Sequence, residues 1–311
     1  MTELRILHLS DSHLTGDGTL HSGLVDTVSA FRLTLAAFDD VGPLDLVVLS
    51  GDVSDDGSPS SYRTLRSLTD DFAARRGAVA VYAMGNHDER AGFKEVLGTG
   101  HPGGIAGLGS GPVMGASEVA GYRVVTLDSS VPGRTHGFLD AGQLDWLRTE
   151  LSVDSPRGSV VVVHHPPVPP VTALHHGIEL QNPAGLADAL AGSDAVLILS
   201  GHYHHPMSDF LQAGTNAVPV LVAPGIVNSN CVLAGTGRER ATAGSGGTLI
   251  TLRPGPGGRA TVRALPVAVP LPPEVTPAEI FDLDPAAVAE ISARISAQPL
   301  SATSVQQRNS P

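Results

Sequence analysis

The stretch AVLILSGHYHH, residues 195–205, joins a run of apolar residues to a glycine and three histidines. Valine, isoleucine and leucine in a short continuous run favour a buried β-strand. A glycine at its end lets the chain turn sharply. His202 and His204 are one residue apart, so both imidazoles can turn toward one point. We therefore expect a buried strand with a binding site at its carboxyl end.

Four other apolar runs end in the same way. They are LRILHL (4–9) before Asp11 and His13, LDLVVLS (44–50) before Asp52, AVAVYAM (78–84) before Asn86, His87 and Asp88, and SVVVV (159–163) before His164 and His165. In open α/β sheets, ligands bind at the carboxyl edge of the strands. The sequence therefore predicts that these polar side chains meet at one edge.

The chain reads as an α/β protein with buried sheets, because the strand candidates are continuous apolar runs rather than strict alternations. Further strands are expected at 123–127, 195–200, 218–222, 247–252 and 261–265, and helices at 23–38, 58–75, 140–151 and 183–191. The second half is richer in strands, which favours a layered sandwich over one long parallel sheet. The glycine-rich stretches 98–117 and 234–247 are expected to be loops.

A composition change divides the chain near residue 270. Residues 1–270 are expected to form the catalytic domain. Residues 271–311 are expected to form a C-terminal extension with a short helix at about 284–295 and a disordered tail.

Charge and composition argue against some classes of function. The 311 residues carry a formal net charge of −12, which argues against binding long nucleic acid through a basic surface. The single cysteine excludes an intrachain disulfide framework. We find no signal peptide and no apolar stretch long enough to span a membrane, so the expected location is cytoplasmic.

Seven of the polar side chains at the strand ends can bind metal: Asp11, His13, Asp52, Asn86, His164, His202 and His204. Carboxylate, imidazole and amide oxygen suit divalent ions such as Mn, Fe or Zn, and the absence of thiolates argues against a structural zinc site. Seven ligands are too many for one tetrahedral ion. They suit two ions that share a carboxylate, a common arrangement for hydrolysing phosphate esters.

The blocks DSH, GD, GNHD, HHPP and GHYH, in this order, resemble those of the calcineurin-like binuclear metallophosphoesterases. LDSSVPG (127–133), QLDWL (143–147) and HHPPVP (164–169) are similar to the bacterial class III cyclic-nucleotide phosphodiesterases of that family. A Tyr-Gly-x-x-Asp segment of this branch corresponds to Gly23 and Asp26, but Ser22 replaces the tyrosine.

The resemblance implies a four-layer α/β/β/α sandwich, two divalent ions (Mn or Fe, with Zn or Co as alternatives) and a homodimer. It assigns the ligands as follows: Asp11, His13, Asp52 and His204 for the first ion, and Asp52, Asn86, His164 and His202 for the second, with Asp52 bridging. His87 would be catalytic, facing the phosphate or protonating the leaving oxygen. Asp88 would orient His87, and His165 would lie behind the ligands.

The expected activity is hydrolysis of 3′,5′-cAMP and 2′,3′-cyclic nucleotides to nucleoside monophosphates, with a hydroxide generated at the ions attacking phosphorus. The alternative is a phosphodiesterase for glycerophosphodiesters or other small diesters. A non-catalytic metal-binding scaffold is disfavoured because all seven ligands and His87 are present. Asp55 and Asp56 are expected to form a solvated turn, and His8 to be packed in its strand or to lie behind the ligands.

Overall fold

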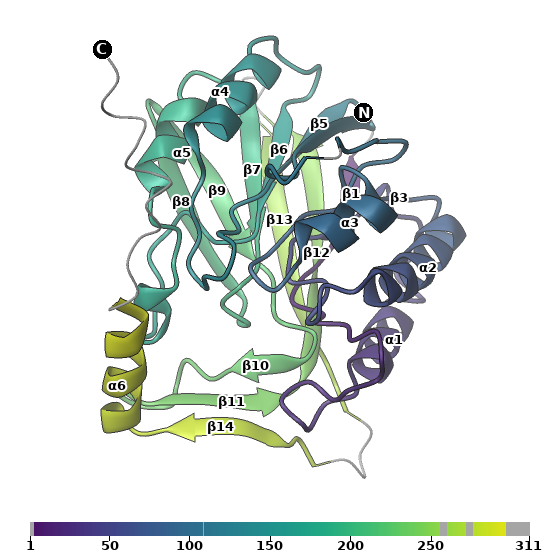
Figure 1. Ribbon diagram of the computed structural model, residues 1–311. Coiled ribbons are helices and arrows are strands. Elements are labelled where there is room, and N and C mark those ends of the chain that lie inside the picture. Colours follow the sequence, from purple (N-terminus) through teal and green to yellow (C-terminus); the bar gives the residue numbers. More distant parts are fainter. Residues whose placement is uncertain (1–2, 108, 256–259, 272–275, 297–311) are drawn as a thin grey trace.

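The computed structural model describes residues 3–107, 109–255, 260–271 and 276–296. It confirms the four-layer α/β/β/α sandwich (Figure 1). Two large sheets pack face to face, and helices cover the outer face of each sheet. No helix in these ranges is long and apolar enough to cross a membrane.

The first large sheet has five strands in the order β13-β12-β1-β2-β3. Their bounds are Ala260–Val269, Ser245–Pro254, Leu4–Leu9, Leu46–Leu49 and Val79–Tyr82. The second has six strands in the order β4-β5-β6-β7-β9-β8. Their bounds are Gly115–Val119, Tyr122–Leu127, Ser159–Val163, Ala195–Ser200, Asn216–Val222 and Met207–Ala213. Strands β1, β2 and β3 of the first sheet are parallel, as are β5, β6, β7 and β9 of the second, so the carboxyl ends of each set lie at one edge.

Both faces of the central strands are buried, which explains their continuous apolar runs. In β1, Ile6 belongs to the core between the two sheets, whereas Leu7 belongs to the core under the outer helices. Fully burying one such side chain contributes about 1.5–3 kcal/mol. A solvent-facing sheet would have needed polar residues at alternate positions.

Five helices accompany the large sheets, and one follows them. The bounds are α1 Thr27–Ala37, α2 Pro59–Arg76, α3 Arg90–Leu97, α4 Ala141–Glu150, α5 Pro183–Leu190 and α6 Pro285–Ser296. Helix α1 begins four residues later than expected, because Asp26 is its N-cap and accepts from Ser29 N at 3.0 Å. Ser58 caps α2, accepting from Ser61 N at 3.2 Å.

A third, small sheet has the order β10-β11-β14, with bounds Asn228–Asn230, Glu239–Ala243 and Glu279–Leu283. It lies below the carboxyl ends of the sandwich strands in Figure 1. Strand β14, from the predicted C-terminal extension, pairs with β11 of the predicted catalytic domain. Helix α6 agrees with the helix expected at 284–295. The tail predicted to be disordered falls mostly at 297–311, outside the described residues.

Two loop predictions were wrong in part. Strand β4 begins at Gly115, inside the glycine-rich stretch 98–117, and β11 occupies Glu239–Ala243, inside 234–247. Both are supported by antiparallel pairing with a neighbour, β5 and β14 respectively. Cross-strand hydrogen bonds override the low strand propensity of these segments.

Candidate metal centre

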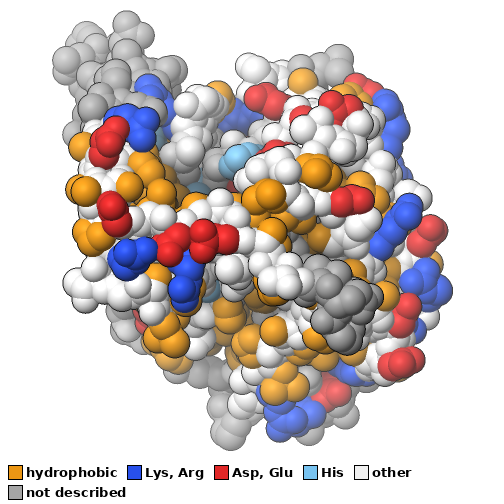
Figure 2. Space-filling view, turned by 90° about the horizontal axis from the view of Figure 1, so that it is seen from below, with side chains coloured by type: hydrophobic (Ala, Val, Ile, Leu, Met, Phe, Trp, Pro, Cys, Tyr) orange, Lys and Arg blue, Asp and Glu red, His pale blue; other side chains and the backbone are white. Residues whose placement is uncertain are grey.

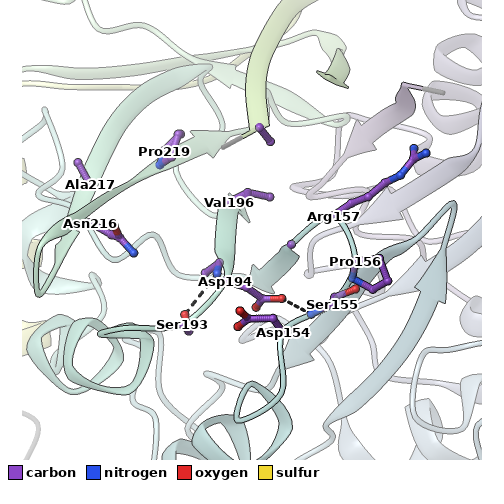
Figure 3. Close-up of a pocket in the computed structure, with 13 residues that line it drawn as sticks. Asp154, Ser155, Pro156, Arg157, Ser193, Asp194, Val196, Asn216, Ala217 and Pro219 are labelled. Atoms are coloured by element: carbon purple, nitrogen blue, oxygen red, sulfur yellow. Dashed lines mark hydrogen bonds between the residues drawn. The ribbon is translucent and has the colours of Figure 1, made fainter. Parts of the chain in front are cut away.

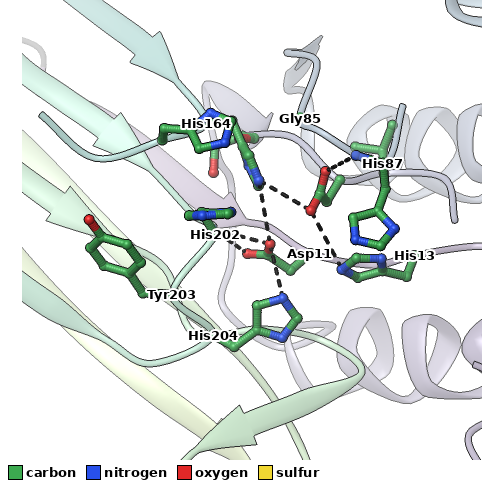
Figure 4. A network of polar contacts seen from close by, with 12 residues as sticks. Asp11, His13, Gly85, His87, His164, His202, Tyr203 and His204 are labelled. Atoms are coloured by element: carbon green, nitrogen blue, oxygen red, sulfur yellow. Dashed lines mark hydrogen bonds and ion pairs between the residues drawn. The ribbon is translucent and has the colours of Figure 1, made fainter. Parts of the chain in front are cut away.

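The five predicted strand ends meet at one point (Figure 4). One group of ligand atoms joins Asp11, His13 and His204, and another joins Asp52, His164 and His202; within each group the atoms lie within 4.8 Å of one another. A further group links His13 and Asp52 to His87. The two carboxylates lie among the imidazoles: Asp11 Oδ1 is 3.2 Å from His204 Nε2, and Asp52 Oδ2 is 3.2 Å from His164 Nε2.

The backbone at this edge is strained. Among the described non-glycine residues, positive φ angles occur at seven positions, and five of these are predicted ligands: Asp11, His13, Asp52, His202 and His204. The left-handed region is sparsely populated by residues that carry a Cβ, and each instance costs on the order of 1–3 kcal/mol. Such strain clusters at functional sites, where it turns side chains inward.

Glycines give these side chains room. A Cβ on Gly51 would lie 2.5 Å from His164 Nδ1, and one on Gly85 would lie 2.2 Å from Asp52 Oδ1. A Cβ on Gly201 would lie 1.8 Å from Ser10 Oγ. The glycine before each of these motifs is therefore required by close packing.

The hydrogen bonds of two histidines leave one ring nitrogen for a metal. His164 Nδ1 donates to Ser50 O at 3.0 Å, and His204 Nδ1 donates to Asn228 Oδ1 at 2.6 Å. Each bond fixes a tautomer whose Nε2 carries a lone pair. Both Nε2 atoms are the ones that face a carboxylate.

His202 has the reverse arrangement: its Nε2 donates to Ile178 O at 2.8 Å, so the lone pair of the neutral ring lies on Nδ1. The Nε2 atoms of His13 and His164 and Oδ1 of Asn86 are buried without a hydrogen-bond partner. Buried polar atoms normally have a hydrogen-bond partner, so these unpartnered atoms are suited to bind a metal ion. Nitrogen and oxygen donors converging in this way suit divalent metal ions.

The buried carboxylates and imidazoles of the site have shifted pKa values. Burial opposes ionisation of Asp11, but His204 and His164 lower its pKa to about 2. The pKa of Asp52 is also held well below its usual value, by His164 and His87 acting against burial. Burial lowers the pKa of His13 to about 4 and that of His202 well below its usual value. Against burial, the same two carboxylates raise the pKa of His164 to about 9 and that of His204 above its usual value. Ionised carboxylates and neutral imidazoles are the forms that bind metal, so metal binding at these two rings would release protons.

Asp55 belongs to this centre, contrary to the prediction of a solvated turn. Its Oδ1 lies 3.0 Å from His13 Nδ1, 3.1 Å from His87 Nδ1 and 3.4 Å from His21 Nδ1. The sequence signal was available: Asp55 follows Asp52, the expected bridging ligand, by three residues. A carboxylate behind a metal-binding imidazole fixes its tautomer and orientation.

Among the described residues, the hydrogen bonds and ion pairs of Asp88 do not include the His87 ring. Its oxygens accept from the backbone N–H groups of Val53, Ser54 and Gly85 and from Tyr62 Oη. The prediction that Asp88 orients His87 is corrected accordingly: Asp88 ties the two loops together, and Asp55 is the partner of the His87 ring.

Four further histidines can be placed relative to the ligands. His8 is buried and bonds Ser50 Oγ through Nε2 at 2.9 Å, as expected for a packed residue. His165 lies behind the ligands, with Nδ1 2.7 Å from Ser129 Oγ and its ring 4.3 Å from that of His202. His21 and His175, for which no sequence motif indicated a role, line the cavity at the site.

A cavity of about 250 Å³ opens on the metal centre. It is lined by His13, His21, Ser22, Asp52, Asn86, His87, Thr135, Leu174, His175, Ile178, His202, His204, Asn228, Asn230, Ile280 and Phe281. A second cavity, of about 420 Å³, lies at the amino ends of β6, β7 and β9, where Ser155 N donates to Asp194 Oδ2 at 2.6 Å (Figure 3). None of the metal-binding groups found among the described residues lines it. The chemistry therefore lies at the carboxyl edge.

The family model for calcineurin-like phosphoesterases matches residues 4–206, which include all five strand-end motifs. The chain belongs to the calcineurin-like phosphoesterase family. As a member of this family with phosphodiesterase relatives, it is a metal-dependent phosphodiesterase. The geometry agrees, because the site has the donor types and the unpartnered buried atoms that metal ions require.

Three relatives of this calcineurin-like phosphoesterase bear on its substrate. A probable cyclic nucleotide phosphodiesterase of Rhodococcus erythropolis is 36% identical over 78% of this chain and 77% of its own length. A cAMP/cGMP dual specificity phosphodiesterase of Mycobacterium tuberculosis is 36% identical over 73% of this chain and 67% of its own. A glycerophosphodiester phosphodiesterase of Enterobacter lignolyticus is 28% identical over 70% of this chain and 77% of its own.

Proposed function

We propose that this phosphodiesterase hydrolyses cyclic nucleotides, 3′,5′-cAMP and also 2′,3′-cyclic nucleotides, to nucleoside monophosphates. The observation that carries the proposal is the place of Asp52 between the two ligand groups, with its Oδ2 3.2 Å from His164 Nε2 and 3.8 Å from His13 Nε2. The 36% identical relatives of this chain are named for cyclic nucleotides. The Enterobacter relative, at 28% identity, supports glycerophosphodiesters as the second candidate substrate class.

The proposed residues for two ions are those that the resemblance assigns, and the observed donor groups and the unpartnered Asn86 Oδ1 support them. Asp11, His13 and His204 would hold the first, and His164, His202 and Asn86 the second, with Asp52 shared between them. When bound, two such ions polarise the phosphate oxygens and lower the pKa of the attacking water. The identity of the metal, with Mn or Fe expected and Zn or Co as alternatives, belongs to the proposal.

His87 is proposed to act on the substrate directly. Its backbone N–H donates to Asp52 Oδ1 at 2.8 Å, and Asp55 holds its Nδ1, which leaves Nε2 to donate to the phosphate or the leaving oxygen. Burial would lower the pKa of His87, but the charges of Asp52 and Asp55 raise it to about 9. These two carboxylates favour the protonated form of the ring, which is the form that a general acid needs.

A role in cleaving long nucleic acid is not favoured. On the face seen from below, Lys and Arg are interspersed with Asp and Glu, without a continuous basic patch in the part that the structure describes (Figure 2). With a net charge of −12, this surface gives a polyanion little attraction. Homodimerisation and a cytoplasmic location stay predictions; light scattering of the purified protein tests the first.

A substrate panel tests the proposal. Mn-loaded protein is assayed for kcat/KM on 3′,5′-cAMP, 2′,3′-cAMP, glycerophosphoethanolamine and p-nitrophenyl phosphate. We expect the highest kcat/KM on a cyclic nucleotide, with a phosphomonoester as product. A higher kcat/KM on glycerophosphoethanolamine would replace the proposed substrate class by the second candidate.

A variant tests the role of His87. His87→Ala is expected to keep its metal and lose about 10²- to 10⁴-fold in kcat. The matched control is His176→Ala, which removes an imidazole that is 60% exposed. Unchanged turnover in His87→Ala, with metal bound, would remove His87 from the mechanism.

A further inference from the structure

The small sheet contributes to the cavity at the metal centre. Ile280 and Phe281 of β14 line this cavity together with the metal ligands. They lie more than 70 residues beyond the end of the family match at residue 206. The part of the chain that folds under the sandwich therefore completes a site whose ligands all come from the matched region.

The lining has a polar part and an apolar part. The predicted metal ligands supply the polar part, where a phosphate group binds. Leu174, Ile178, Ile280 and Phe281 supply the apolar part, which we call the apolar wall. Phe281 is half-buried, and it is the one Phe, Tyr or Trp side chain among the described lining residues.

A β-bulge lets two consecutive residues of β14 face the same cavity. Successive side chains of a regular strand point to opposite faces. In the pairing with β11, Ala241 is opposite Phe281 but Thr242 is opposite Glu279, so Ile280 is the extra residue on β14. Bulges re-aim side chains in this way and are frequent beside active sites.

The apolar wall is tied to the metal ligands. Leu174 N donates to Glu239 Oε1 of β11 at 2.9 Å, and Ile178 O accepts from the ring of His202. Helix α6, which follows β14, packs against the short helix His175–Gly177 between these two residues. The wall is therefore held in a fixed relation to the ligands rather than on a free loop.

We propose that Phe281 is a specificity-determining residue: its ring stacks on the base of a nucleotide whose phosphate is held by the metal centre. This proposal rests on the proposed function. Stacking of a base on an aromatic side chain is worth about 1–3 kcal/mol by alanine substitution. A glycerol or ethanolamine group offers no flat face to stack, so Phe281 favours nucleotides over small diesters.

A neighbouring cavity is a weaker candidate for the base. It measures about 590 Å³, and its described lining, which includes Asn86 and Val131, contains no aromatic ring. Its basic groups are already engaged: Arg90 Nε lies 2.8 Å from Asp128 Oδ2, and Lys94 Nζ donates to Gly109 O at 2.6 Å. Val131, which lines this cavity, is the position of the matched control variant.

Calorimetric titration of Mn-loaded protein tests the proposal without turnover. The probes are 5′-AMP and inorganic phosphate, which differ by the nucleoside. Phe281→Ala is expected to raise the Kd of 5′-AMP by about 5- to 150-fold, equivalent to 1–3 kcal/mol, and to leave the Kd of phosphate within about twofold. The control Val131→Ala leaves both Kd values unchanged. Phe281→Leu, which keeps an apolar side chain in the wall, guards against loss of the fold and gives an intermediate increase.

The outcomes separate this proposal from the proposed function. If 5′-AMP binds no more tightly than phosphate, or if Phe281→Ala and Phe281→Leu leave their ratio unchanged, the stacking role is overturned. It is also overturned if Val131→Ala, rather than Phe281→Ala, weakens 5′-AMP. If the ratio changes as expected but the wild-type protein hydrolyses no cyclic nucleotide, the role of Phe281 stands and the proposed reaction fails.

Discussion

Asp55→Asn tests whether a residue that is not itself a predicted ligand controls metal binding and catalysis at this site. One oxygen of Asp55 lies 3.0 Å from His13 Nδ1 and 3.1 Å from His87 Nδ1. Burial opposes its ionisation, but the close contacts with His13, His21 and His87 hold its pKa far below the usual value. Asparagine keeps the shape of the side chain and removes the charge that fixes these rings.

Loss of a carboxylate behind a metal-binding histidine typically costs 10- to 100-fold in metal affinity or activity. We therefore expect Asp55→Asn to raise the Kd for Mn²⁺ by this factor, about 1.4–2.7 kcal/mol, when metal-free protein is titrated in a calorimeter. At saturating metal, kcat/KM should also fall, because His87 loses its partner.

The neighbouring carboxylate is the control. Asp56 accepts from the backbone N–H groups of Gly16 and Ser58, at 2.7 and 3.0 Å, and contacts no imidazole. Asp56→Asn should lower stability without changing the Kd for Mn²⁺. Equal Mn²⁺ affinities in Asp55→Asn and Asp56→Asn would refute the reasoning.

Three further predictions address packing, pH and metal. Gly85→Ala places a Cβ 2.2 Å from Asp52 Oδ1, so we expect a lower melting temperature and weaker metal binding than in Gly107→Ala, where a Cβ meets nothing within 4 Å; equal values would contradict this. Burial lowers the pKa of His101 from 6.5 to about 4, so below pH 6.5 the unfolded chain binds a proton that the folded chain does not. The free energy of unfolding should therefore fall by up to about 3 kcal/mol as the pH drops toward 4. Urea titrations at two pH values should show a smaller drop in His101→Gln, and an equal drop would exclude this origin. Chelation of the metal should abolish turnover and lower the melting temperature, and Mn²⁺ should restore both, since a ligand of the folded state stabilises it; an unchanged melting temperature would mean that the chain binds no metal.

The layers and the strand-end motifs could be predicted because both depend on local patterns. Continuous apolar runs such as 159–163 indicate strands buried on both faces, and parallel strands bring their carboxyl ends to one edge. His164 and His202 are therefore predicted to be neighbours although 37 residues separate them in the sequence, and the structure brings them together with Asp52.

Features set by tertiary contacts could not be predicted in this way. Asp55 reads as a turn residue, and only the fold brings three imidazoles to its carboxylate. From the sequence, Asp88 is expected to be a partner of the adjacent His87. In the structure its oxygens instead accept hydrogen bonds from backbone N–H groups of two loops. Phe281 lies in a segment whose sequence shows no strand alternation. Its place at the site depends on a bulge and on the pairing with β11.

The central claim is that this edge of the sandwich binds two metal ions that together hydrolyse a cyclic nucleotide. The most direct measurement is titration of the metal-free protein with Mn²⁺ while 3′,5′-cAMP turnover is followed. Turnover should rise until two equivalents of Mn²⁺ per chain have been added and then stay constant. Turnover that saturates at one equivalent, or that proceeds without metal, would contradict the account.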